Sequence, residues 1–173
     1  MSVREVHYKD LCKTHARLFR FAAKNSYDMD HFAKVFMNSK VVNLDMDDIE
    51  YGYYSPYQVS FPIDLVNVLE DEEKEKGFSF PVYSQEKENE DKAAWIGEMY
   101  RKVQEATGVL SKDIYEVLPY KRMKDLWIGG HTVADAIIVD DLKSIVENHI
   151  KEADKERDEW FSIFNSKKSK KFK

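Results

Sequence analysis

The sequence predicts an all-α fold: a single compact domain of six or seven helices with one irregular tyrosine-rich loop or small hairpin. Apolar residues recur at spacings of three and four through most of the chain, which is the period of an amphipathic helix. Residues typical of helix ends, among them Gly108, Pro119 and Thr132, separate these stretches. With 173 residues, 43% of them hydrophobic, the chain can bury one sizeable core, so we expect one domain over residues 1–165.

The first half of the chain predicts three helices. Residues 3–24 carry an apolar stripe at helical spacing, formed by Tyr8, Leu11, His15, Leu18 and Ala22. Asp28 offers an N-cap for a short helix that stops at Asn38-Ser39. Pro62 suits the first turn of a third helix, which Gly77 ends, and residues 78 to about 89 read as a long exposed connection.

Residues 44–60 differ from the rest of the chain and predict an irregular loop or hairpin. Tyrosines in such a loop supply a large contact area, so this segment is a candidate interface, although packing within the domain explains it equally well. The acidic run 45–50 invites comparison with a calcium loop, but Glu50 and Pro56 stand where glycine and a bidentate acid are required. The candidate interface residues are Tyr51, Tyr53, Tyr54 and Tyr57.

The second half predicts four helices. A strong stripe begins near Asn89 and ends at Thr107-Gly108. Ser111 can cap a short helix, and Pro119 can close it and open the next, whose inward residues would be Met123, Leu126 and Trp127 and whose end would be Gly129-Gly130. Thr132 to Asp135 has the form of a capping box, so a long helix should start there. Its stripe would contain Ile138, Leu142, Ile145, His149, Ala153, Trp160 and Phe164.

The sequence contains no complete catalytic, metal-binding, cofactor or nucleotide motif. The five histidines have no spacing that would direct two imidazoles at one metal, and we expect His15 and His149 to lie in the core or at its boundary. The single cysteine, Cys12, should be buried and agrees with a reducing cytoplasm. Caps and stripes leave the polar residues Arg101, Tyr115 and His131 unexplained, and these three, with Asp135 as a neighbouring acid, are the candidate polar site.

The charge of the chain is divided unevenly. The formal net charge is -5, but the last seven residues carry five lysines, so the other 166 residues sum to -10. An acidic body repels nucleic acid and attracts basic partners, whereas a lysine-rich end can contact phosphates. We expect a disordered tail over residues 166–173, with nucleic acid as a possible partner of Lys167, Lys168, Lys170, Lys171 and Lys173, and no membrane-spanning helix.

The stretch from Trp95 to Leu142 resembles an uncharacterised family of small bacterial helical proteins. The resemblance lies in Trp95 to Arg101, Thr107-Gly108, Ser111 to Tyr115, His131-Thr132 and Ala136 to Leu142. It implies a place beside toxin-antitoxin modules that include an ADP-ribosyltransferase-like component, which concerns gene neighbourhood rather than mechanism. Phe36 to Ser39 also resembles the family, so the resemblance covers roughly residues 30–145, whereas Gly129-Gly130 and the long lysine-ended helix depart from the family pattern.

Three functions follow as hypotheses. The first is a non-enzymatic protein-binding module, an antitoxin-like or accessory partner of another protein. The second is a toxin-like enzyme, a nuclease or transferase, in which His131 and Arg101 would stabilise developing negative charge. The third is a nucleic-acid-binding regulator that uses the lysine-rich end. The missing catalytic motifs and the acidic body favour the first.

Overall fold

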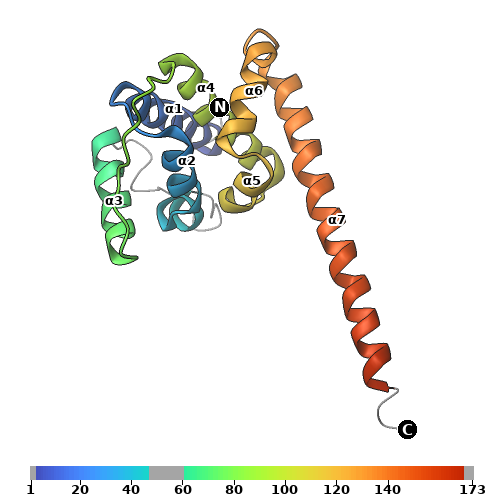
Figure 1. Ribbon diagram of the computed structural model, residues 1–173. Helices are drawn as coiled ribbons and strands as arrows, with labels where there is room; N and C mark the ends of the chain where they lie inside the picture. Colours follow the sequence, from blue (N-terminus) through green and yellow to red (C-terminus); the bar gives the residue numbers. More distant parts are fainter. Residues whose placement is uncertain (1–2, 47–60, 170–173) are drawn as a thin grey trace.

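The all-α prediction is confirmed by a computed structural model, which describes residues 3–46 and 61–169, with the side chains of residues 8–44, 46 and 61–162 (Figure 1). Within those residues β pairing is limited to an isolated antiparallel bridge between Tyr27 and Tyr83. The helices in chain order are α1 (Val3–Lys24), α2 (Met29–Asn38), the π-helix η1 (Val41–Met46), α3 (Pro62–Glu75), α4 (Glu90–Thr107), α5 (Ser111–Val117), α6 (Tyr120–Gly130) and α7 (Asp135–Ser169).

Helix α4 is the centre of the fold, because it packs against α1, α5, α6 and α7. Its closest neighbour is α1, and Gly97 makes that approach possible. A Cβ at position 97 would lie 2.7 Å from the backbone oxygen of His15 and 2.7 Å from the ring of Phe19. Only glycine therefore fits at this crossing without a shift of one of the helices.

A cluster of aromatic rings fills the core between α1, α2 and α4. Phe19 is fully buried and meets Phe32 and Phe36 edge to face, at centroid distances of 5.3 and 5.6 Å. The Tyr100 hydroxyl donates a 2.8 Å hydrogen bond to the Leu118 carbonyl, which ties the end of α5 to α4. Edge-to-face pairs and satisfied buried hydroxyls fix the orientation of neighbouring helices as well as filling space.

Most predicted helix ends are confirmed. Asp28 accepts a hydrogen bond from the His31 N–H and caps α2, Asn89 caps α4 in the same way, and Gly108 ends α4 at φ 68°. The prediction for Ser111 is wrong: α5 begins at Ser111, which is buried, and Leu110 takes the N-cap position. Tertiary packing buries Ser111 in the first turn of α5, and the residue does not act as the cap of that helix.

The connection between α3 and α4 was expected to be exposed, and most of it is. Phe80 is the exception, because it is buried beside Tyr27 and stacks near Phe32. The connection also pairs with the α1–α2 turn, since the Asp28 N–H donates to the Val82 carbonyl and the Ser84 N–H to the Ser26 carbonyl, both at 2.8 Å. This segment therefore covers one end of the aromatic core.

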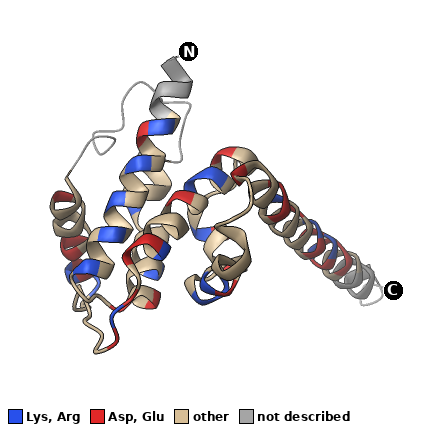
Figure 2. Cartoon of the chain, turned by 90° about the horizontal axis from the view of Figure 1, so that it is seen from above, with Lys and Arg blue, Asp and Glu red and all other residues tan. Residues whose placement is uncertain are grey.

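Helix α7 packs on α4 and α5 through its first half only. Leu142 and Val146 are buried, whereas every side chain from Lys151 to Ser162 is exposed, and the helix extends away from the other helices (Figures 1 and 2). The core or boundary position predicted for His149 is wrong, because its side chain is exposed where the body ends.

The end of α7 also differs from the predicted tail. The helix runs to Ser169, so the backbone is helical over 166–169, where a disordered segment was expected to begin. This part of the sequence contains no helix breaker, and lysine is a good helix former that is favoured near the negative C-terminal end of a helix. Residues 170–173 lie outside the described residues.

Candidate protein-binding surface

The turn between α6 and α7 does not follow the predicted caps. Helix α6 runs through Gly129 and Gly130, and His131 is its C-cap in a right-handed conformation. Thr132 donates its hydroxyl hydrogen to the Gly129 carbonyl at 3.0 Å and so closes α6, and α7 starts only at Asp135. The capping box was therefore misassigned, because Thr132 found a closer partner in the preceding helix.

An aromatic stack runs outward from α4 to this turn. Trp95 of α4 meets Trp127 of α6 edge to face at 5.5 Å, and the Trp127 ring stacks on His131 at 4.1 Å with an interplanar angle of 17°. The Nδ1 atom of His131 also contacts the Trp127 carbonyl. The stack holds the exposed His131 ring in one orientation at the molecular surface.

Beside this stack lies the most exposed large apolar side chain among the described residues. Ile128 is 80% exposed, and Val133 in the following turn is 38% exposed. We call Trp127, Ile128, His131 and Val133 the corner surface. An isolated exposed isoleucine is ordinary, but one next to a tryptophan and a stacked histidine has the composition of a protein-binding surface.

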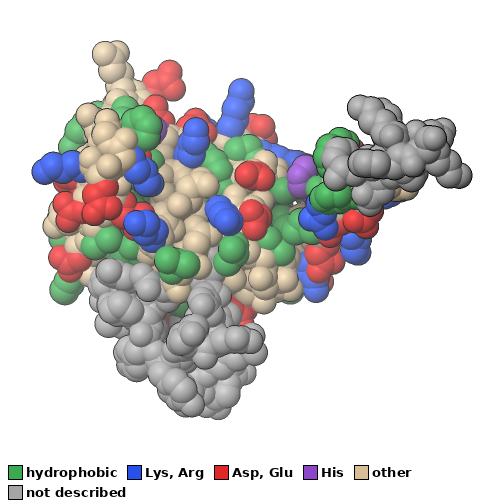
Figure 3. All heavy atoms as spheres, turned by 90° about the horizontal axis from the view of Figure 1, so that it is seen from below, with side chains coloured by type: hydrophobic (Ala, Val, Ile, Leu, Met, Phe, Trp, Pro, Cys, Tyr) green, Lys and Arg blue, Asp and Glu red, His purple; other side chains and the backbone are tan. Residues whose placement is uncertain are grey.

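A groove of about 590 Å³ lies between α6 and α7. Leu126, predicted to face the core, instead lies on the groove wall and is 36% exposed. Gly129 leaves space there, since a Cβ at this position would meet nothing within 4 Å, whereas a Cβ at Gly130 would lie 3.2 Å from the Trp95 ring. Figure 3 shows hydrophobic side chains interspersed with charged ones on the face seen from below. The groove is lined by Asp125, Leu126, Gly129, Gly130, Ile138, Asp141, Leu142, Ser144 and Ile145.

The four residues of the predicted polar site have separate surroundings. Arg101 is 1% exposed in the interior, with its guanidinium 3.8 Å from the Glu105 carboxylate. Tyr115 donates its hydroxyl hydrogen to the Asp30 carbonyl at 3.2 Å, and burial, with the Asp30 charge second, raises its pKa. Asp135 binds Lys102 and fastens the start of α7 to α4. His131 alone of the four is part of an exposed apolar surface.

The other predicted functional residues cannot be placed. Tyr51, Tyr53, Tyr54 and Tyr57 lie outside the described residues, as do the side chains of the five terminal lysines. Leu126 and Ile128, which are exposed, were not among the interface residues predicted from the sequence. The sequence does contain a signal for their exposure, the run of three apolar residues from Leu126 to Ile128. One face of a helix cannot bury three consecutive side chains.

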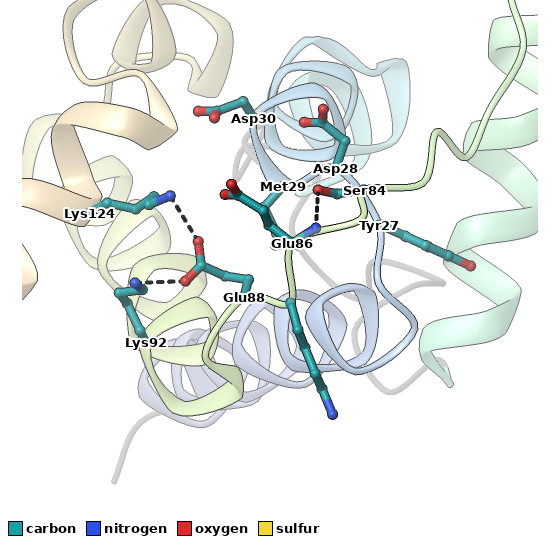
Figure 4. Close-up of a pocket in the computed structure, with 10 residues that line it drawn as sticks. Tyr27, Asp28, Met29, Asp30, Ser84, Glu86, Glu88, Lys92 and Lys124 are labelled. Atoms are coloured by element: carbon teal, nitrogen blue, oxygen red, sulfur yellow. Dashed lines mark hydrogen bonds and ion pairs between the residues drawn. The ribbon is translucent and has the colours of Figure 1, made fainter.

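A second hollow, of about 410 Å³, is polar (Figure 4). It lies between the start of α2, the connection before α4, and α6. Glu88 binds Lys92 at 2.7 Å and Lys124 at 3.1 Å, and burial opposes ionisation of Glu88 while these lysines outweigh it and lower its pKa. This ion-pair network joins the connection to α4 and α6, so the polar hollow has a structural role.

The buried titratable groups of α1 are predicted correctly. Cys12 is 5% exposed, and burial raises its pKa to about 11, which leaves a thiol at neutral pH. His15 is fully buried, and burial followed by the Arg101 charge lowers its pKa to about 3. Among the residues that the structure describes, no group of three or more acidic, histidine or cysteine side chains is arranged to hold a metal ion.

The chain matches no protein-family model, no curated protein and no solved structure. Among the described helices, none combines the length and apolarity needed to cross a lipid bilayer.

Proposed function

We propose that the chain is a non-enzymatic protein-binding module, an antitoxin-like or accessory partner that binds another protein through the corner surface. The observation that carries the proposal is Ile128, 80% exposed beside the stacked pair of Trp127 and His131. A tryptophan whose ring is held by stacking can bind a partner at little entropic cost, and the exposed Ile128 next to it in the sequence adds apolar contact area.

The charge of the molecule supports this class of function. A body of net charge -10 favours partners with basic surfaces and speeds their association. The resemblance of the stretch from Trp95 to Leu142 to proteins from toxin-antitoxin loci agrees with a protein partner. The separate surroundings of Arg101 and His131 give no support to a shared catalytic centre.

The experiment compares proteins captured in native cells by the wild-type chain and by Ile128→Asp. A charge at the centre of the corner surface should lower the affinity of the partner by on the order of thirty-fold, the effect of losing an interface hot spot. Phe78→Asp is the matched control, because Phe78 is 64% exposed on the connection after α3. Capture is followed by chemical crosslinking and mass spectrometry, and the affinity is then measured with the purified partner.

A protein recovered with the wild type and with Phe78→Asp, but lost with Ile128→Asp, supports the proposal. Identical sets of proteins recovered with all three chains would overturn it.

A further inference from the structure

The second half of α7 extends beyond the body without tertiary packing. Residues 151–169 add about 28 Å of helix at 1.5 Å per residue. Ion pairs within the helix, such as Arg157 with Asp154 at 2.9 Å, support it locally. Helices that lack a packing surface are nevertheless marginally stable in water, so this half has the character of a helix that packs on something else.

The face of α7 that packs on the body continues into the projecting half. Trp160 follows Leu142 by 18 residues, which is five helical turns, so the two side chains point in the same direction. His149 and Ala153 lie close to the same line. Leu142 is 2% exposed, whereas Trp160 is 58% exposed. The apolar stripe is therefore buried at Leu142 and exposed at Trp160.

We infer that two copies of the chain pair through antiparallel α7 helices, with Trp160 of each copy in the groove between α6 and α7 of the other. Leu142 on the groove wall and Trp160 are equally far from residue 151. A two-fold symmetry axis at residue 151 therefore places the Trp160 side chain of each copy in the groove of the other. Such a contact is closed and self-complementary, as in most homodimers.

The charges along α7 favour the same pairing. Asp125 and Asp141 line the groove, and Asp135 and Asp140 stand in the first turns of α7, whereas the last seven residues carry five lysines. In the antiparallel pair, residue 167 of one copy lies opposite residue 135 of the other. The helical residues 167–169 of each copy therefore lie beside the acidic start of α7 in its partner.

An anionic membrane fits this helix less well than a second copy. Five acids stand between Lys151 and Trp160, immediately before the exposed aromatic residues. A lipid surface that attracted the lysines would repel those acids, because they lie within one Debye length of the aromatic residues. A protein groove with its own fixed charges meets no such conflict.

This pairing uses a different part of α6 from the corner surface. Leu126 lies on the groove wall, and Ile128 is two residues, or about 200°, further around the helix. Self-association and the binding of another protein can therefore be disrupted one at a time.

The test is sedimentation equilibrium of the full-length chain over a range of concentrations. We expect a species of twice the chain mass of 20.4 kDa. Trp160→Glu should raise the dimer dissociation constant by on the order of thirty-fold, as loss of an anchor at an interface does. Gly129→Gln should do the same by filling the groove, and since its Cβ meets no atom and glutamine favours helix, the monomer stays folded.

Phe161→Glu is the matched control. Phe161 is 50% exposed and adjacent to Trp160, but it points about 100° away from the groove-facing stripe. The dimer should persist in this variant. For every chain, the association of the dimer should be weaker in 500 mM NaCl, because salt screens the exposed, oppositely charged ends of the paired helices.

A spin label at Ser162→Cys in a Cys12→Ala background tests the orientation. Antiparallel helices centred on residue 151 place the two labels about 33 Å apart along the axis, and parallel helices place them about 10 Å apart. A chain that is monomeric at all concentrations, a dimer insensitive to Trp160→Glu and Gly129→Gln, or the short label distance would each overturn the inference. So would a monomer that co-sediments with phosphatidylserine vesicles through Trp160.

Discussion

At the scale of single residues, the structure separates side chains that hold the fold from side chains that are exposed at the corner surface. Gly97, His15 and Arg101 all lie where α1 meets α4, and none of them is more than slightly exposed. His131 and Ile128 are exposed at the corner surface. The stretch from Trp95 to Leu142 therefore contains both interior and exposed side chains, and the side of α4 or α6 that a residue occupies decides which it is.

Gly97→Ala should destabilise the protein by about 3 kcal/mol, at the upper end of the usual cost of overpacking, because the new Cβ meets backbone as well as a ring. The measurement is the free energy of unfolding in urea. Gly129→Ala is the control: it meets no atom within 4 Å and should stabilise the helix by about 1 kcal/mol. Equal effects of the two substitutions would show that α1 and α4 do not approach closely at Gly97.

The stability of the protein should fall as the pH is lowered below 6.5, in part because of His15. Its pKa is about 3 in the folded protein and 6.5 in the unfolded chain, so between these values only the unfolded chain binds the proton. Each pH unit in that range costs about 1.4 kcal/mol. Between pH 7 and pH 5, the wild type should lose about 2 kcal/mol more than His15→Gln, measured by urea unfolding. Parallel pH profiles for the two chains would contradict the buried neutral imidazole.

At the scale of elements, the two halves of α7 differ in how they pack. Its first half is a packed helix of the domain, with Leu142 and Val146 buried and Asp135 bound to Lys102 of α4. Its second half has no buried side chain among the residues from Lys151 to Ser162. Because the free energy of folding comes mainly from buried apolar surface, the two halves contribute very differently to stability.

Truncation after Ile150 should leave the stability of the monomer almost unchanged. The comparison is with full-length Trp160→Glu, since both chains are then monomeric. We expect their free energies of unfolding in urea to agree within about 0.5 kcal/mol, while circular dichroism shows the loss of helix in the truncated chain. A loss of more than about 1 kcal/mol would mean that the projecting half packs on the body.

At the scale of the whole molecule, the acidic body and the lysine-rich end give the chain an electrostatic polarity that matches the geometry of α7. The helix carries the basic end away from its own body, about 28 Å beyond Ile150. The lysines of residues 167–169 are thus separated from the acidic body, although five acids stand between Lys151 and Trp160 of the same helix. In the proposed dimer, these residues of one copy would approach the acidic start of α7 in the other.

The sequence by itself determined the helices, because their evidence is local. Apolar spacing and residues such as Asp28, Asn89 and Gly108 located most helix ends correctly. Burial of His15 followed from its place on a stripe, and burial of Cys12 from its small apolar side chain on a helix. The candidate site was predicted only in part. His131 does lie at an exposed turn, but Arg101 proved to be an interior residue, and Ile128 was not identified.

Only the tertiary structure decided which stripes are covered. The period of α7 is the same at Leu142 and at Trp160, yet one is buried and the other exposed, because the body of the protein ends near Ile150. The close crossing at Gly97 and the groove beside Leu126 likewise depend on where a second helix lies. A sequence records the face that a helix offers, and the arrangement of its neighbours determines whether that face is core or binding surface.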